Sequence, residues 1–316
     1  MTNRLIERDI TAAPGDATLK QLSTKHRSLW LDVWNQFRNH TGALIGVAVL
    51  AVIVIAVVLG PSIHDIDAQR LDPRIANEGP SLEHPFGTDN LGRDLLAQVL
   101  AGGRVSLAVG VVAMLISLVV GTLIGVLAGF SRMLDGPLMR LTDLFLALPL
   151  LPLLLVIILL FRDALRTALG PEAGIFLLMV FVIGITSWMQ TARIVRGDVL
   201  SIKEQEFVTA ARSIGTRKRR VITRHILPNV MSPIMVSATL GVANAIITES
   251  ALSFLGLGFP PDFPTWGRLL FDGTNFMTLT PERVIWPGLA ISLTVLSVNY
   301  IGDGLRDALD PRLRGR

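Results

Sequence analysis

Few residues in this chain of 316 have the types and spacing that catalysis requires. There is no cysteine, which excludes disulfides, thiolate metal sites and a cysteine nucleophile. The five histidines are scattered, and no two of them stand at the i, i+4 spacing of a helical metal site. None of the four lysines follows a glycine, so the phosphate-binding loop G-x-x-x-x-G-K-[ST] is absent. We therefore expect no catalytic residue, no metal site and no bound cofactor in this chain.

Three polar residues near the end of a long apolar interval are candidates for a polar path. They are Asn244, Glu249 and Ser250. An ionisable side chain near membrane depth is by default a candidate functional group. The alternative interpretation, which we prefer, is a carboxylate at the outer end of a span that is hydrogen-bonded to a neighbouring helix. The amide of Asn244 is likewise more often a contact between helices than a contact with a solute.

A polar segment, residues 193–228, predicts a short surface helix. Ser201 followed by Glu204 fits a capping box that opens the helix, and Gly215 is placed to end it in the left-handed region. One face of the helix would carry Phe207, Ala210, Ala211 and Ile214. An amphipathic helix with such a small-residue face needs an apolar partner. The basic run TRKRRVITRH that follows suits anionic lipid instead.

The composition places these residues in a membrane protein. Hydrophobic residues make up 51% of the chain and charged residues 17%, and the mean hydropathy is +0.55. Soluble domains carry about 25% charged residues, so the composition excludes a disordered chain and argues strongly against an ordinary soluble enzyme. No nucleic-acid partner is expected, because the arginine clusters stand beside apolar blocks.

Intervals without charge predict six membrane-spanning helices, since about 20 apolar residues cross the bilayer core. The predicted spans are Gly42–Gly60, closed by Pro61, the interval between Arg104 and Arg132, Leu144–Phe161 with its start near Pro137, Ala173–Ala192, the interval between His225 and Glu249, and the interval between Arg283 and Asp303. In the second span a stripe of small residues would let another helix approach closely. Its members are Gly121, Gly125 and Gly129.

Basic residues predict the orientation of the spans. With the N-terminus in the cytoplasm, 21 of the 29 lysines and arginines lie on the cytoplasmic side and eight on the outer side. We therefore expect both termini in the cytoplasm. The expected layout is a cytoplasmic N-terminal segment 1–40 and a membrane domain 41–316, with outer loops 61–103 and 256–283 and a cytoplasmic loop 193–228.

Within the cytoplasmic loop, the stretch EFVTAARSIGTRKRRVITRHILPN resembles the signature of inner-membrane permeases of ABC importers. The positions that match this signature are Ala210, Ala211, Gly215, Leu227 and Pro228. Thr209 stands where the general pattern has Glu, and His225 where it has Ile. These departures resemble the dipeptide, oligopeptide and nickel branch, in which an earlier Glu, here Glu206, is usual. Blocks at 84–107, 249–270 and 299–314 also resemble that branch.

This resemblance implies an all-α, type I importer permease with six transmembrane helices in the bacterial cytoplasmic membrane. The implied partners are a second homologous permease, two ATP-binding cassette ATPases that hold ATP and Mg, and an extracytoplasmic substrate-binding protein. The helix ending at Gly215 would be the element that couples the permease to an ATPase. The residues assigned to coupling are Glu206, Thr209, Ala210, Ala211, Arg212, Gly215 and Pro228.

Two other functions are weighed against an importer subunit. A secondary transporter or channel without an ATPase would need ionisable relays inside the membrane, and the spans offer few besides Glu249. A membrane-embedded enzyme would need a nucleophile with its base, or a metal site. The expected cargo is a di- or oligopeptide, and glutathione and nickel complexes remain open.

Overall fold

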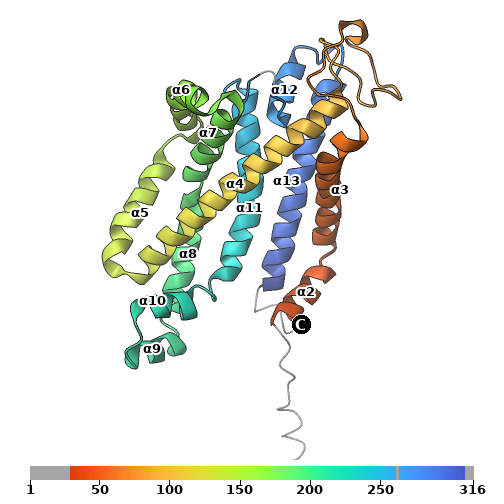
Figure 1. Ribbon diagram of the computed structural model, residues 1–316. Coiled ribbons are helices and arrows are strands. Elements are labelled where there is room, and N and C mark those ends of the chain that lie inside the picture. The colour runs from red at the N-terminus through yellow and green to blue at the C-terminus, as the bar shows by residue number, and fades with distance from the viewer. Residues whose placement is uncertain (1–28, 261–262, 310–316) are drawn as a thin grey trace, which may run out of the picture.

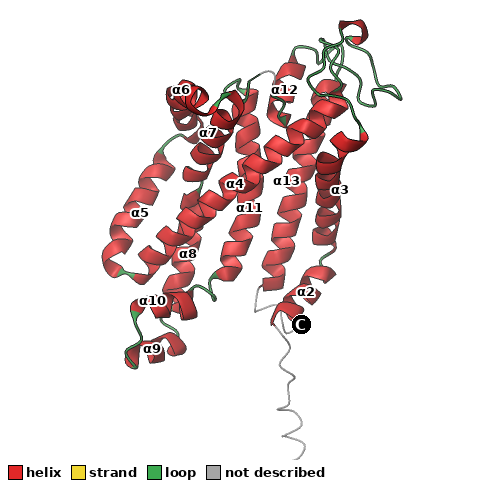
Figure 2. Ribbon diagram, in the orientation of Figure 1, coloured by secondary structure: helices red, strands yellow, loops and turns green. Residues whose placement is uncertain are grey.

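The computed structural model of this chain describes residues 29–260 and 263–309. Within these ranges the regular elements are helices, and the only strand-like pairing is an isolated bridge between Thr88 and Asp94 (Figure 2). The helices are α2 (Leu29–Asn39), α3 (Thr41–Ile63), α4 (Leu95–Phe130), α5 (Arg132–Ala147), α6 (Leu150–Leu169), α7 (Pro171–Ile185), α8 (Trp188–Ile202), α9 (Glu206–Ser213), α10 (Lys218–Val221), α11 (Met231–Phe254), α12 (Trp266–Thr274) and α13 (Glu282–Leu309). The predicted all-α class is confirmed.

The long helices give the number of membrane crossings. Five segments of the described chain are long and apolar enough to span a bilayer: α3, α4, α7 with α8, α11 and α13. The bent pair of α5 and α6 makes a sixth when it is taken as one broken span. The protein is therefore a multi-pass membrane protein, and the prediction of six spans agrees with the larger count.

Several predicted boundaries differ from those of the helices. α4 begins at Leu95, so the outer loop predicted at 61–103 is shorter than expected. α11 continues to Phe254, which places Glu249 inside the helix and not at its end. The N-terminal segment 1–40 contains α2, which was not predicted, and its residues 1–28 lie outside the described chain, as do positions 261–262 and 310–316. The predicted boundaries were set at charged residues, which mark where a span leaves the apolar part of the membrane. A helix can continue past that point, because it ends only where its backbone hydrogen bonds end.

The third predicted span is not one continuous helix. The predicted range Leu144–Phe161 includes the break between α5 and α6, whose axes meet at 88°. Leu148 is extended at φ −76° and ψ 137°, and Pro149 follows it. A residue before proline is disfavoured in the helical region, and the proline itself has no N–H to donate, so the helix stops here. α5 lies alongside α8, and α6 turns aside at the end where α12 lies (Figure 1).

Pro61 does not close the first span as predicted, because α3 continues to Ile63. A proline inside a helix leaves the carbonyl four residues earlier without its donor. That carbonyl belongs to Val57, and the Arg104 side chain of α4 supplies the bond: Nε lies 3.0 Å from the Val57 oxygen. Its Nη2 donates to the Val58 oxygen at 2.8 Å. The two helices are thus joined at the proline.

The glycine stripe of α4 packs closely against another helix, as predicted, and that helix is α8. A Cβ added at Gly125 would lie 2.7 Å from the Ala192 carbonyl oxygen, and one added at Gly129 would lie 2.7 Å from the Val199 Cβ. Only a residue without a side chain permits this approach. Two ion pairs also connect α8 to α5: Arg196 bonds Asp135, and Arg193 bonds Asp143.

The two ends of the bundle differ in structure. The loop between α3 and α4 and helix α12 lie at one end, and α2, α9 and α10 lie at the other (Figure 1). The first end is tied together by Asp94, which accepts from Ala97 N as the N-cap of α4. Its carboxylate also bonds His64 Nε2 at 3.0 Å and His84 Nδ1 at 2.7 Å. The predicted outer and cytoplasmic loops therefore do lie at opposite ends.

Candidate functional site

The short helix α9 lies beyond the end of α8 and begins later than predicted. Ser201 and Ile202 still belong to α8, and α9 begins at Glu206 with Gln205 as its N-cap. The predicted capping box of Ser201 and Glu204 is therefore wrong. Continuous backbone bonding in α8 outweighs the local sequence signal at Ser201, because a cap forms only where a helix starts.

The end of α9 has the geometry predicted for Gly215. Its φ is +77°, in the left-handed region. The Gly215 N–H donates to the Arg212 oxygen at 2.9 Å, and the Thr216 N–H donates to the Ala211 oxygen at 3.1 Å. These two bonds make a Schellman motif, which satisfies carbonyls that the last helical turn leaves free. The chain therefore turns sharply at Gly215 and continues into α10.

The two faces of α9 have different neighbours. Val208 and Ala211 are buried, and Val208 belongs to an apolar cluster at this end of the bundle. The other buried members of that cluster are Val126, Val195, Val199, Val221, Ile226, Val230 and Ile234. Phe207, Ala210 and Ile214 are exposed, with Ile214 at 83%. Ala211 was predicted on the same face as these three and instead points inward, so the outward apolar face is smaller than predicted.

The other residues assigned to the coupling loop lie in α9 or beyond it. Glu206 is exposed in the first turn, and the Thr209 carbonyl accepts from the Ser213 hydroxyl at 3.0 Å. The Arg212 guanidinium lies 5.1 Å from the centre of the Phe130 ring, at the end of α4. Pro228 is exposed and follows a π-helical turn, Ile222–Ile226, that leads towards α11. Val208, Val221 and Ile226 of this region pack in one apolar cluster with Val195 and Val199 of α8.

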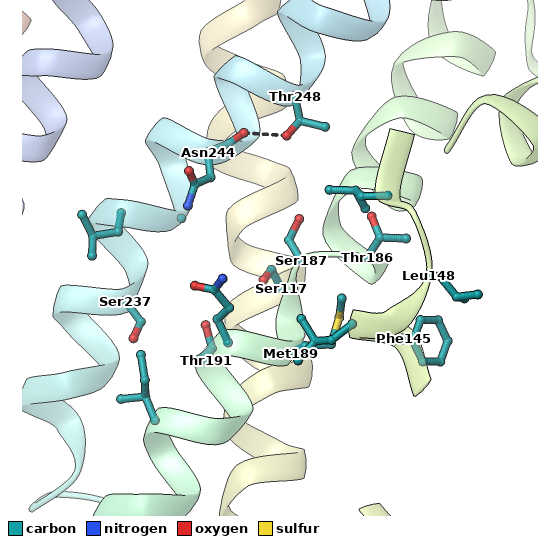
Figure 3. Close-up of a pocket in the computed structure, with 16 residues that line it drawn as sticks. Ser117, Phe145, Leu148, Thr186, Ser187, Met189, Thr191, Ser237, Asn244 and Thr248 are labelled. Carbon is teal, nitrogen blue, oxygen red and sulfur yellow. Dashed lines mark hydrogen bonds between the residues drawn. The ribbon is translucent and has the colours of Figure 1, made fainter. Parts of the chain in front are cut away.

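A second feature, a cavity of about 330 Å³, lies between α4, α8, α11 and the two helix breaks (Figure 3). One break is Leu148–Pro149, between α5 and α6. The other is Thr186–Ser187, between α7 and α8. The lining residues are Ser117, Phe145, Leu146, Leu148, Leu150, Thr186, Ser187, Met189, Gln190, Thr191, Ile194, Ser237, Leu240, Gly241, Asn244 and Thr248. Interrupted helices at membrane depth are tolerated where they line such a cavity.

The structure separates the three predicted path residues. Asn244 lines the cavity, whereas Glu249 and Ser250 are not among its lining residues. Glu249 is fully buried, and its carboxylate accepts from Ser253 Oγ at 2.7 Å and from Ser106 Oγ of α4 at 3.0 Å. The Ser106 hydroxyl in turn accepts from the Trp266 N–H at 3.2 Å, so this network joins α4, α11 and α12.

Sequence reasoning missed most of the cavity. Its polar side chains are neutral and come from three separate segments of the chain, so their spacing in the sequence carries no signal. Two local signals did mark the helix breaks: the proline after Leu148, and the adjacent hydroxyls of Thr186 and Ser187. Both hydroxyls bond back to carbonyls of α7, at 2.7 Å each. Such bonds compete with helix continuation.

No group of three or more histidine, aspartate or glutamate side chains is placed to hold a metal ion in the part of the chain that the structure describes. The cavity lining likewise contains no aspartate, glutamate, lysine, arginine or histidine. What this arrangement offers is hydrogen bonding by uncharged groups, together with apolar contact from residues such as Phe145 and Leu240.

Comparison with known proteins gives two family matches. Residues 121–315 match the family described as binding-protein-dependent transport system inner membrane component. Residues 28–80 match the N-terminal TM domain of oligopeptide transport permease C.

Similar proteins carry related names. The oligopeptide transport system permease protein of Bacillus subtilis is 38% identical over 304 residues, which cover 96% of this chain and 95% of that protein. The dipeptide transport system permease protein of Alkalihalophilus pseudofirmus is 37% identical, with 91% of each chain covered. The glutathione transport system permease protein of Escherichia coli is 38% identical, with 92% of each covered.

Proposed function

Because the chain belongs to the family of binding-protein-dependent transport system inner membrane components, we propose that it is the membrane-spanning subunit of an ATP-driven importer for di- or oligopeptides. In this proposal it forms a translocation path with a second, homologous permease. Two cytoplasmic ATPases bind ATP and Mg, and an extracytoplasmic binding protein delivers the substrate. The chain itself contributes transport and no hydrolysis.

The outward face of α9 is the observation that carries the proposal of ATPase coupling. Phe207, Ala210 and Ile214 present apolar surface at the end of the bundle, beyond the membrane-crossing segments. Exposed apolar residues on a rigidly held surface helix are suited to a groove on a partner. The buried face of the same helix, with Val208 fully buried, holds α9 on α8, so displacement of α9 moves the bundle.

We propose that α9 faces the cytoplasm, that both termini are cytoplasmic and that the membrane is the bacterial inner membrane. The excess of basic residues on that side, 21 against eight, supports this orientation. The loop between α3 and α4 and helix α12 then face outward, where a binding protein delivers its ligand. ATP-driven closure of the ATPases favours one of two bundle conformations through differential affinity.

Peptides are the proposed cargo because the similar proteins are named for oligopeptide, dipeptide and glutathione transport. Glutathione is itself a peptide derivative. The polar, uncharged cavity between the helix breaks is compatible with such solutes.

The test is co-expression with the candidate ATPases and the second permease, followed by affinity purification and measurement of ATP-dependent uptake of labelled peptide into proteoliposomes. We expect the ATPases to copurify and uptake to require ATP and the binding protein. Peptide uptake that proceeds without an ATPase would instead support a secondary transporter or channel.

Two matched variants locate the contact. Ile214→Asp places a charge on the outward face of α9, where Ile214 is 83% exposed, and should abolish ATPase capture while the permease remains abundant. Leu82→Asp places the same charge on a side chain that is 104% exposed in the loop between α3 and α4, and should leave ATPase capture intact. Equal capture by both variants would contradict the assignment of α9 as the coupling helix.

A further inference from the structure

The cavity between the two helix breaks holds polar groups that the protein leaves without partners. Ser237 Oγ is buried and has no hydrogen-bond partner. Among the described residues, no hydrogen bond is formed by the side chains of Ser117, Gln190, Thr191 and Asn244 either. All five side chains line the same cavity (Figure 3 labels Ser117, Thr191, Ser237 and Asn244).

Two hydroxyls elsewhere in the bundle are satisfied within their own helices, whereas Thr122 Oγ1 of α4 is also buried without a partner. Thr142 donates to the Leu138 carbonyl of its own helix at 2.8 Å, and Thr294 donates to the Ala290 carbonyl at 2.7 Å. A polar group withdrawn from bulk water without a partner costs about 1–3 kcal/mol. Ser237 Oγ is such a group, and the other four side chains face the same cavity with unused donors and acceptors, so the cavity favours an occupant that can hydrogen-bond to them.

The lining also indicates the chemistry of that occupant. Hydroxyls and carboxamides both donate and accept, so they can pair with a peptide amide in either direction. No charged side chain lines the cavity. Of the charged residues nearest in sequence, Asp143 and Arg193 bond each other, and Glu249 accepts from Ser106 and Ser253. Such a lining recognises neutral amides and offers no counter-ion to a charged terminus or side chain.

We propose that this cavity binds the main-chain amides of a transported peptide and is indifferent to the charge of the peptide's side chains. This inference rests on the proposed peptide-import function. The cavity's volume, about 330 Å³, is at the small end of the range for small-molecule sites, so it holds a dipeptide or a short part of a longer chain. Discrimination between peptides then falls to other parts of the transporter.

The first test uses the absence of cysteine from the chain. Ser237→Cys and Asn244→Cys place single thiols on the cavity, and Thr167→Cys places one on an exposed residue of α6 as the matched control. In the assembled transporter, a neutral dipeptide should slow modification of the first two thiols by a small thiol reagent about fivefold and leave the third unchanged, as expected when a ligand competes for a site. Equal rates with and without peptide at all three positions would overturn the proposal.

The second test adds a charge to the cavity. With wild type and variant supplied with the same binding protein, the preference of that protein cancels in the comparison. Asn244→Asp should improve uptake of lysine-containing over glutamate-containing peptides by about fivefold relative to wild type, because an opposite charge in a site of low dielectric attracts strongly. The control is Thr167→Asp, which adds the same charge at an exposed residue of α6 outside the cavity. A buried threonine such as Thr294 would not serve, because a charge there would destabilise the fold.

The outcomes separate the two proposals. If the wild-type transporter shows no ATP-dependent peptide uptake, the proposed function fails. If the wild type imports peptide but the thiols are unprotected and the Asn244→Asp preference is unchanged, the function stands and the cavity holds water only, so the inference fails.

Discussion

At the scale of single residues, Glu249 illustrates how a buried carboxylate can serve structure. Its two oxygens accept from Ser106 and Ser253, and the Ser106 hydroxyl accepts from the backbone of Trp266. A buried charge or carboxyl is costly unless it is hydrogen-bonded, and here the bonds come from α4 and from α11 itself, while α12 bonds the Ser106 hydroxyl. The site therefore joins α4, α11 and α12 at the end of the bundle where α12 lies.

We predict that Glu249→Gln assembles and transports at close to the wild-type rate, because the carboxamide retains an acceptor and the serine hydroxyls can reorient. Glu249→Leu removes both acceptors and should lower stability by about 1–3 kcal/mol. The measurements are thermal unfolding of the purified permease and peptide uptake. An assembled Glu249→Gln complex that does not transport would instead place Glu249 in the translocation path.

The contact of Arg104 with α3 gives a second prediction at this scale. Arg104→Leu removes the donors to the Val57 and Val58 carbonyls and should destabilise the permease by about 1 kcal/mol or more. Pro61→Ala restores the N–H that Val57 lacks, so the loss from Arg104→Leu should be smaller in the Pro61→Ala background. A double-mutant cycle on unfolding midpoints measures this coupling. Additive effects would show that Arg104 does not compensate for the proline.

At the scale of elements, the sequence predicted what depends on local pattern. The straight apolar helices α3, α4 and α13 were found from charge-free intervals, and the left-handed conformation of Gly215 followed from its place after an amphipathic segment. An apolar stretch of sequence does not show whether the helix axis bends within it, so the 88° break at Pro149 was missed. Ala211 was placed on the outward face because its helical phase did not reveal which side α8 and its valines would cover.

The cavity could not be predicted from the sequence. Ser117, Gln190 and Ser237 lie on different helices, and each one alone has the character of an ordinary helix contact. Their convergence depends on how α4, α8 and α11 pack, which is set by contacts far apart in sequence, among them the glycine stripe of α4.

The end of α9 gives the prediction at the element scale. An added Cβ at Gly215 meets no atom within 4 Å, so substitution acts through backbone strain alone at φ +77°. A residue with a Cβ costs about 1–2 kcal/mol in the left-handed region, and a β-branched residue is worse. Asn tolerates that region best among non-glycine residues.

We therefore predict that Gly215→Val leaves membrane insertion and abundance close to normal but abolishes stimulation of ATP hydrolysis by the loaded binding protein. Gly215→Asn, the matched control, should retain most of the stimulation. ATPase assays on reconstituted complexes, with a pull-down for subunit stoichiometry, measure both. Full stimulation and normal import by the Val variant would mean that the Schellman turn is not needed for coupling.

At the scale of the whole molecule, the two ends of the bundle differ in the kind of surface and bonding that they contain. The end with α12 is held by buried polar bonds around Asp94 and Glu249, whereas the end with α9 presents an exposed apolar helix face. The helices between them include two that are broken beside a polar cavity. Gln190, Thr191 and Ile194 of the cavity lining belong to α8, so in the proposed coupling a movement of α9 that carries α8 with it would reach the cavity.

This arrangement requires that the two ends face opposite sides of the membrane in one orientation, which gives the last prediction. Because the chain has no cysteine, Leu82→Cys and Ser213→Cys each provide a single exposed thiol, the first in the loop between α3 and α4 and the second at the end of α9. A membrane-impermeant maleimide should label the Leu82→Cys variant in intact spheroplasts and the Ser213→Cys variant only after permeabilisation. The physical reason is the retention of lysine and arginine on the cytoplasmic side, 21 against eight. Labelling of Ser213→Cys from outside would place α9 out of reach of any cytoplasmic ATPase and would overturn both the orientation and the proposed coupling.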